Sequence, residues 1–200
     1  MVKKESKNNE ILLPNRKAFL KDVENGFFNK LVIFDISGFG NINHYYGYDF
    51  GEKILKIISV RLQERFENSQ MYYLGGDVFV ATASEDISKE RFIQTIKATT
   101  WHFGYSPIEL DGHKVYIPLR AGVAINYPEL LFCAEFALKQ TRVLKHNLVI
   151  FDSEQHQVCH PNSLTTEQDL YWEAQIIQAI KKDRFEIFAQ SISKDRKSVV

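Results

Sequence analysis

The sequence predicts an α+β fold in which helices pack against one mixed, mostly antiparallel sheet of about five strands. Apolar residues recur at helical spacing in several segments, and short apolar or alternating runs, typical of strands, lie between them. After an opening helix, the segments follow in the order strand, two helices, hairpin, helix, hairpin, helix, strand. This order differs from the strict strand–helix alternation of a doubly wound parallel sheet, and therefore favours the α+β class.

Length and composition limit the function classes. The chain has 200 residues, of which 44% are hydrophobic, enough for one core or for one domain and the start of a second. Its 25 basic residues balance 25 acidic ones, so the broad positive field that attracts nucleic acid or membranes is missing. Two cysteines form no disulfide framework, and no apolar run approaches the roughly 18 residues of a membrane span. We expect a soluble cytoplasmic protein that binds neither nucleic acid nor membrane.

The first half of the chain predicts an opening helix, a buried strand and two further helices. Pro14 precedes the opening helix, and Asn15 is its expected N-cap. Residues 31–34 form a continuous apolar run that delivers Asp35 at its end, as a central strand would. A short helix is expected over 41–46, and a long amphipathic helix is indicated by apolar residues at every fourth position, Phe50, Ile54, Ile58, Leu62 and Phe66.

The second half predicts two hairpins, each followed by a helix, and a closing strand. Glycine-containing turns separate the strands of both hairpins, which is typical of tight connections. The expected ranges are strands 71–74 and 78–81, a helix over 89–102, strands 108–110 and 115–125, a helix from 129 to about 145, and a strand over 148–151.

Composition also predicts the domain boundaries. A polar lead covers residues 1–11, and the α+β domain covers 12–152. The apolar content collapses over 153–166, where a linker is expected. The segment 167–200 then begins a new helix with an apolar stripe, followed by an alternating strand.

Two carboxylates mark a candidate site. Asp35 ends a buried strand and Asp77 lies in a hairpin turn, an arrangement that can hold Mg²⁺ against nucleotide phosphates. Residues 37–41 can turn sharply into a helix and offer backbone N–H groups to phosphate. The alternative is purely structural, with Asp35 capping a helix and Gly75-Gly76 forming an ordinary hairpin turn. The residue types alone leave both interpretations open.

Several spaced motifs follow one another over about residues 12–152. They are Leu13-Pro14-Asn15-Arg16, Asp35-Ile36, Phe39, Ile42-Asn43, Gly47, Gly51, Gly75-Gly76-Asp77-Val78-Phe79, Arg120-Ala121-Gly122-Val123-Ala124 and Ala134-Glu135-Phe136-Ala137-Leu138. In type and order these motifs resemble the GGDEF family, with Arg120 in the place of the family's serine. That family consists of diguanylate cyclases, which condense two GTP molecules into cyclic di-GMP, with each subunit of a dimer presenting one GTP. The resemblance therefore implies GTP and a second copy of the chain as partners.

The resemblance assigns roles at the metal and guanine ends of the site. Asp35, the backbone carbonyl of Ile36 and Asp77 would hold Mg²⁺ together with GTP. Asn43 would hydrogen-bond the guanine edge. The second guanine contact, an aspartate in the family, is Glu52 here, which keeps the charge and adds one methylene.

The resemblance also assigns a phosphate grip. Phe39 and Gly40 lie in the loop that would offer N–H groups to the phosphates. A lysine and an arginine one helical turn apart grip the phosphates in the family, and here the corresponding pair is Arg142 and His146. Because histidine is only partly charged at neutral pH, this grip is expected to be weaker.

Other departures remove charges from the same site. The acidic fourth position of the motif is Val78, the second aspartate after the strand is Ser37, the loop lysine is Gly40, and the arginine before the two glycines is Tyr73. Phosphoryl transfer depends on positioning and electrostatic stabilisation, so each loss lowers the rate. No intact catalytic set is expected in the degenerate motif, which consists of Gly75, Gly76, Asp77, Val78 and Phe79.

The product-inhibition site of many cyclases is also altered. Its Arg-x-x-Asp motif becomes Phe66 and Ser69 at the corresponding positions. Arg65 and Asn68 have the same spacing one residue earlier but lack the acid. Feedback inhibition through this site is not expected.

The segment after the linker resembles the opening helix and first strand of the EAL phosphodiesterase domain, carried by Leu170 to Ala179 and by Phe185-Glu186-Ile187-Phe188-Ala189-Gln190-Ser191-Ile192. The resemblance implies a downstream EAL domain. We expect a degenerate GGDEF domain that regulates this phosphodiesterase and binds GTP together with weakly held Mg²⁺. A weakly active diguanylate cyclase and a structural dimerisation module without nucleotide are the alternatives.

Overall fold

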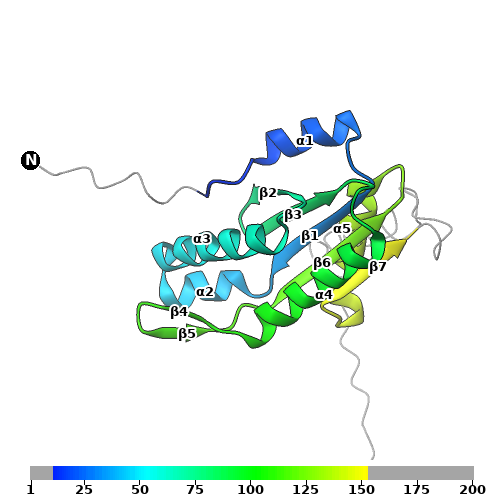
Figure 1. The fold of residues 1–200 in the computed structure, drawn as a ribbon. Helices are drawn as coiled ribbons and strands as arrows, with labels where there is room; N and C mark the ends of the chain where they lie inside the picture. Colours follow the sequence, from blue (N-terminus) through cyan, green and yellow to red (C-terminus); the bar gives the residue numbers. More distant parts are fainter. Residues whose placement is uncertain (1–10, 153–200) are drawn as a thin grey trace, which may run out of the picture. The chain divides into compact units, whose positions relative to one another are not determined.

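The computed structural model describes residues 11–152, which form a five-stranded sheet flanked by helices (Figure 1). The strand order is β2-β3-β1-β6-β7, and a separate two-stranded sheet pairs β4 with β5. The elements are α1 (Arg16–Asn25), β1 (Lys30–Ile36), α2 (Phe39–Tyr46), α3 (Tyr48–Arg65), β2 (Gln70–Gly75), β3 (Val78–Ala83), α4 (Lys89–Tyr105), β4 (Ile108–Leu110), β5 (His113–Val115), β6 (Leu119–Ile125), α5 (Leu130–Leu144) and β7 (Leu148–Asp152).

The predicted fold class is confirmed. Strand β1 lies at the centre of the sheet and runs antiparallel to both of its neighbours, β3 and β6. Strand β7 pairs with β6 in parallel, which makes the sheet mixed. Every residue of β1 is buried, as its continuous apolar run predicts.

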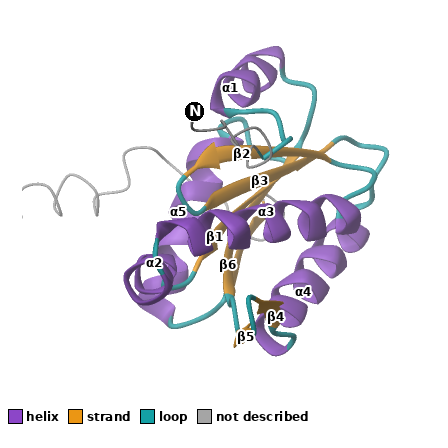
Figure 2. Cartoon of the chain, turned by 90° about the vertical axis from the view of Figure 1, so that its left-hand side faces the viewer, coloured by secondary structure: helices purple, strands orange, loops and turns teal. Residues whose placement is uncertain are grey.

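Helices lie on both faces of the sheet (Figure 2), and each face carries its own apolar cluster. Val32, Phe34 and Ile36 of β1 pack with residues of α2, α3 and α4. Leu31 and Ile33 belong to the cluster that includes residues of α1 and α5. Because side chains alternate along a strand, the next residue of that second face is the carboxylate at position 35.

Local signals explain where the helices begin and end. The Asn15 side chain caps α1 by accepting hydrogen bonds from the N–H groups of Lys17 and Ala18 at 3.0 and 3.2 Å, as predicted. Gly26 ends this helix in the left-handed conformation, with φ of 67°. Ser88 caps α4 through the N–H of Arg91 at 3.2 Å.

Helix α5 approaches strand β6 closely at Gly122. A Cβ atom at this position would collide with the backbone carbonyl of Ala134 and the backbone nitrogen of Leu138. These are backbone atoms, which cannot rotate away, so only glycine allows the approach. This contact sets the distance between α5 and the sheet.

The second predicted hairpin is partly wrong. The range 115–125 is not one strand, because β5 ends at Val115 and β6 begins at Leu119. Pro118 lies between them and has no N–H to donate to a ladder. The Pro118 carbonyl instead accepts a hydrogen bond from the N–H of Ser37 at 2.9 Å. Strands β4 and β5 consequently form their own small sheet.

The predicted linker over 153–166 and the helix and strand predicted over 167–200 lie outside the described residues, as does most of the polar lead over 1–11. Among the helices of the described part, none combines the length and the apolar character required to cross a bilayer.

Candidate functional site

The candidate site forms where β1 ends between its two neighbours. Asp35 lies opposite Val78 of β3 on one side and opposite Arg120 of β6 on the other. The N–H of Ile36 donates a hydrogen bond to the carbonyl of Asp77 at 3.2 Å. The register therefore brings the two predicted metal-binding carboxylates to the same end of the sheet.

An ion pair dominates the charge arrangement. The Arg120 guanidinium donates from Nε to Oδ2 of Asp35 at 3.0 Å, and its Nη2 lies 2.7 Å from the same oxygen. Nη2 of Arg142, from α5, lies 3.5 Å from this oxygen. The Asp35 side chain is 7% exposed, that of Arg120 24% and that of Arg142 62%. The pair is thus largely buried, whereas the second guanidinium faces solvent.

Asp77 is half-buried near the same charges. Burial raises the pKa of its carboxyl group, and the negative charge of Asp35 raises it further. Arg142 and Arg120 act in the opposite direction and lower this pKa. The four groups form one local system of two acids and two guanidinium groups, whose formal charges sum to zero.

Tyr73 connects this charged end to the guanine end predicted from the sequence. Its hydroxyl donates to the carbonyl of Gly76 at 3.0 Å, and its ring lies 5.0 Å from that of Phe79. Burial raises the pKa of the Tyr73 hydroxyl, with smaller contributions from the charges of Glu52 and Asp77. Tyr73, at the position predicted to correspond to the family's arginine, therefore lies between the charged end and the guanine end of the site and supplies a neutral hydroxyl.

The predicted guanine-reading residues lie together on α2 and α3. The Oδ1 atom of Asn43 is buried and has no hydrogen-bond partner within the described residues. It packs against Gly51, where a Cβ would collide with it. Glu52 follows Gly51 on α3 and is exposed. An unpaired buried acceptor thus sits beside an exposed carboxylate.

The predicted phosphate loop adopts the expected turn into a helix. Gly38 precedes α2 with φ of 75°, a left-handed conformation that favours glycine. The first two residues of the helix, Phe39 and Gly40, have N–H groups without a preceding helical carbonyl. The Phe39 ring is buried in the core, so it offers its backbone only. Gly40 is exposed, and a Cβ there would meet nothing within 4 Å.

The predicted pair of phosphate ligands needs a correction. Arg142 lies on α5, but the helix ends at Leu144 and Lys145 takes a left-handed conformation with φ of 55°. His146 follows this reversal and is exposed. It therefore does not continue the helical face of Arg142, and the expected spacing of one helical turn is not kept.

Most of the degenerate motif belongs to the hairpin of β2 and β3, and Asp77 is its member in the candidate site. Gly75 ends β2 with φ of 102°, and Gly76, with φ of 62°, lies in the turn that leads to β3. Val78 packs against the apolar cluster on the α1 and α5 face of the sheet, and Phe79 is fully buried on the other face. A valine in the position opposite Asp35 supplies packing and no charge.

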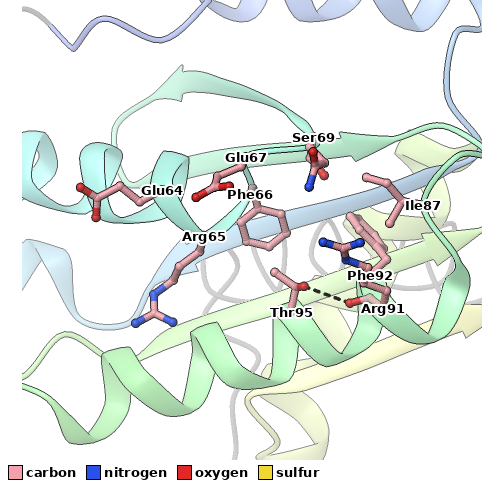
Figure 3. A pocket seen from close by; sticks show the side chains of 10 residues that line it. Glu64, Arg65, Phe66, Glu67, Ser69, Ile87, Arg91, Phe92 and Thr95 are labelled. Atoms are coloured by element: carbon pink, nitrogen blue, oxygen red, sulfur yellow. Dashed lines mark hydrogen bonds between the residues drawn. The ribbon is translucent and has the colours of Figure 1, made fainter.

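The altered product-inhibition position lies in a pocket between α4 and the end of α3 (Figure 3). Phe66 is buried, and its ring makes edge contacts with Phe34 and Phe92. Ser69 lines the same pocket together with Arg65 and Asn68. The side chain in the arginine's place is a core residue, which agrees with the expected loss of this site.

A family model matches residues 12–142 and describes them as the GGDEF domain of diguanylate cyclases. The chain belongs to the GGDEF family. The match runs from the segment before α1 into α5 and includes strands β1 to β6, so that of the five-stranded sheet only β7 lies beyond it.

The chain is also similar to the cyclic di-GMP phosphodiesterase NbdA of Pseudomonas aeruginosa, with 29% identity over 196 residues. The alignment covers 90% of this chain, which spans about a quarter (24%) of the length of that relative. Together with the family match, this relative places the GGDEF domain among proteins of cyclic di-GMP signalling.

Solved structures share the fold. A diguanylate cyclase/phosphodiesterase from Caldicellulosiruptor saccharolyticus has a TM-score of 0.63 and 17% identity, covering 73% of this chain and 92% of its own. The GGDEF domain of DgcB from Caulobacter crescentus, in complex with c-di-GMP, has a TM-score of 0.63 and 16% identity, over 77% and 98%. The GGDEF domain of YfiN from P. aeruginosa has a TM-score of 0.60 and 24% identity, over 70% and 98%.

The GGDEF family uses metal ions with GTP, but the charges of this site do not fit a divalent cation. Protein-bound Mg²⁺ takes carboxylate oxygens at about 2.1 Å. Oδ2 of Asp35 already has a guanidinium nitrogen at 2.7 Å and a second one at 3.0 Å. Among the described residues, no cluster of three or more His, Cys, Asp or Glu side chains could hold a metal ion. Of the metal ligands predicted from the sequence, the buried one, Asp35, is therefore already paired with the positive side chain of Arg120.

The ion pair of Arg120 with Asp35 was not predicted from the sequence. The signal was an arginine at a position where the family has serine, on a strand next to the one that carries Asp35. The pairing of the two strands was needed to see that positions 35 and 120 face each other.

Proposed function

We propose that this chain is a catalytically inactive GGDEF domain that binds GTP and regulates a cyclic di-GMP phosphodiesterase domain that follows it in the protein. The observation that carries the loss of turnover is the ion pair of Arg120 with Asp35 at 2.7 Å. Val78 adds to it, since an apolar side chain takes the place of a second acid. Phosphoryl transfer without these charges lacks the electrostatic stabilisation that it depends on.

Binding of GTP is supported at both ends of the site. Within residues 11–152, the buried Oδ1 acceptor of Asn43 has no donor, and guanine carries N–H groups that could satisfy it after the side chain turns outward. Glu52 is exposed beside it and can accept from the same base edge. At the other end, the Arg142 guanidinium is mostly exposed and can donate to phosphate, as can the N–H groups that open α2.

A regulatory role on a phosphodiesterase is supported by the curated relative. NbdA is named a cyclic di-GMP phosphodiesterase, and its similarity covers 90% of this chain, further than the family model over 12–142. The segment 167–200, after the proposed linker over 153–166, resembles the start of an EAL domain. In this proposal the domain works in the cytoplasm, where GTP is available, and a second copy of the chain is its expected partner.

Calorimetric titration with GTP tests the proposal. We expect saturable binding, weaker by about tenfold in Asn43→Ala, because one hydrogen bond to the base is lost. Asn25→Ala is the matched control, since Asn25 is an exposed asparagine on α1, outside the proposed site. Equal binding of GTP, ATP and CTP, or no binding at millimolar GTP, would contradict the guanine site.

The regulatory part needs the protein with its downstream domain. Hydrolysis of cyclic di-GMP would be measured with and without GTP, in the unmodified protein and in Asn43→Ala. A GTP effect that disappears in the variant is the expected result. A hydrolysis rate that GTP leaves unchanged would separate nucleotide binding from regulation and overturn the regulatory role.

A further inference from the structure

The Asp35 carboxylate already has a positively charged partner, whereas a carboxylate that is available to a metal ion has none. It lies between two strands, opposite Arg120 in the β1–β6 register, so the pair is fixed by backbone hydrogen bonding as well as by charge. Both nitrogens of Arg120 that contact it use the same oxygen, Oδ2. A charge-assisted contact of this kind, on a carboxylate that is 7% exposed, is among the stronger hydrogen bonds in proteins.

The surrounding charges are balanced in this state. Asp35 and Asp77 contribute two negative charges, and Arg120 and Arg142 contribute two positive ones. A divalent cation would add two further positive charges within a few ångströms of Arg120, where like charges repel strongly in partly buried surroundings. The residue opposite Asp35 on its other side, Val78, offers no side-chain oxygen in compensation.

We infer that the Arg120 guanidinium takes the place of the divalent metal ion at this site, because it pairs with the Asp35 carboxylate that would otherwise bind the metal. The exposed guanidinium of Arg142 is then the positive charge that can contact an incoming anion. Ligand binding at this site is then independent of divalent cations. The inference concerns the charge state of the protein alone, so it stands or falls separately from GTP binding.

Binding of Mn²⁺ alone, followed by electron paramagnetic resonance of the free ion, tests this inference without any nucleotide. The unmodified protein is expected to bind no more Mn²⁺ than Asp35→Asn. Arg120→Ser frees the carboxylate and is expected to bind Mn²⁺ at least about tenfold more tightly than the unmodified protein. The double variant Asp35→Asn/Arg120→Ser should lose this gain. Arg91→Ser, which removes an exposed arginine on α4, controls for the change in net charge.

Two results would overturn the inference. One is Mn²⁺ binding by the unmodified protein that Asp35→Asn abolishes, since the metal would then share the carboxylate with Arg120. The other is a folded Arg120→Ser protein that gains no Mn²⁺ affinity. If Arg120→Ser does not fold, Arg120→Gln, which keeps a long polar side chain without charge, replaces it and must show the same gain in Mn²⁺ affinity.

Discussion

Asp35 and Arg120 face each other across β1 and β6, although 85 residues separate them along the chain. The guanidinium contacts one carboxylate oxygen with two nitrogens, at 2.7 and 3.0 Å. The contact changes the expected consequence of removing the acid. Neutralising Asp35 relieves its repulsion of Asp77, but it also breaks the ion pair with Arg120.

Asp35→Asn is therefore expected to destabilise the fold. The loss should be about 2 kcal/mol in the free energy of unfolding, because a largely buried guanidinium loses its charged partner. Denaturant unfolding measures it. Asp111→Asn is the matched control, since Asp111 pairs with Lys53 at 2.8 Å with both side chains about half exposed, and its loss should cost well under about 1 kcal/mol. Equal or higher stability of Asp35→Asn would contradict the ion pair.

Gly122→Ala tests the close approach of α5 to β6. The added methyl group would collide with backbone atoms of Ala134 and Leu138, and we expect a loss of about 3 kcal/mol or more. Gly104→Ala is the control, because nothing lies within 4 Å of a Cβ at that position of α4. It should stabilise the protein by about 0.5–1 kcal/mol through helix propensity. Similar melting temperatures for the two variants would contradict the packing described above.

Tyr72→Phe tests a buried hydrogen bond between β2 and α1. The Tyr72 hydroxyl donates to Oδ2 of Asp22 at 2.7 Å, and its ring makes an edge contact with Phe19. The variant keeps the ring and loses the hydroxyl, so we expect a loss of about 1–2 kcal/mol in unfolding free energy. Tyr105→Phe removes an exposed hydroxyl and serves as the control. Unfolding curves that coincide for Tyr72→Phe and the unmodified protein would show that this bond does not contribute.

His102 is expected to make stability depend on pH. Burial lowers the pKa of His102, and the charges of Arg65 and Arg61 lower it further. The unfolded state therefore takes up the proton first as pH falls below about 6.5, and stability is lost from there down to the lower pKa of the folded state. His102→Gln should show a shallower loss between pH 7 and 5 than the unmodified protein. Replacing the exposed His44 by Gln controls for the loss of an imidazole, and identical slopes for His102→Gln and the unmodified protein would contradict the effect.

Local patterns predicted most of the described elements. The apolar run at 31–34 predicted the central strand, and the four-residue spacing from Phe50 to Phe66 predicted α3, because each element buries its own apolar face. Asn15 predicted the start of α1 through its capping side chain. The end of β5 at Val115 and the start of β6 at Leu119 were not predicted. The apolar run suggests one strand, but Pro118 has no N–H for the strand ladder and interrupts it.

The charge pairing of the site could not be predicted in this way. The position of Asp35 at a strand end was visible in the sequence, and its role was open. The contact with Arg120 depends on which strands are neighbours and in which register, a non-local property that no local spacing contains. The placement of His146 was missed for a related reason, since it depends on the residue at which α5 ends.

Cyclic di-GMP synthesis is the reaction that we propose this GGDEF domain has lost. Prolonged incubation with GTP and Mg²⁺, followed by chromatographic separation of the nucleotides, measures it. We expect no more cyclic di-GMP than from Asp77→Asn, and no recovery in Val78→Glu, because one restored acid leaves Asp35 paired with Arg120. Steady formation of cyclic di-GMP by the unmodified protein that disappears in Asp77→Asn would contradict the proposed loss of activity.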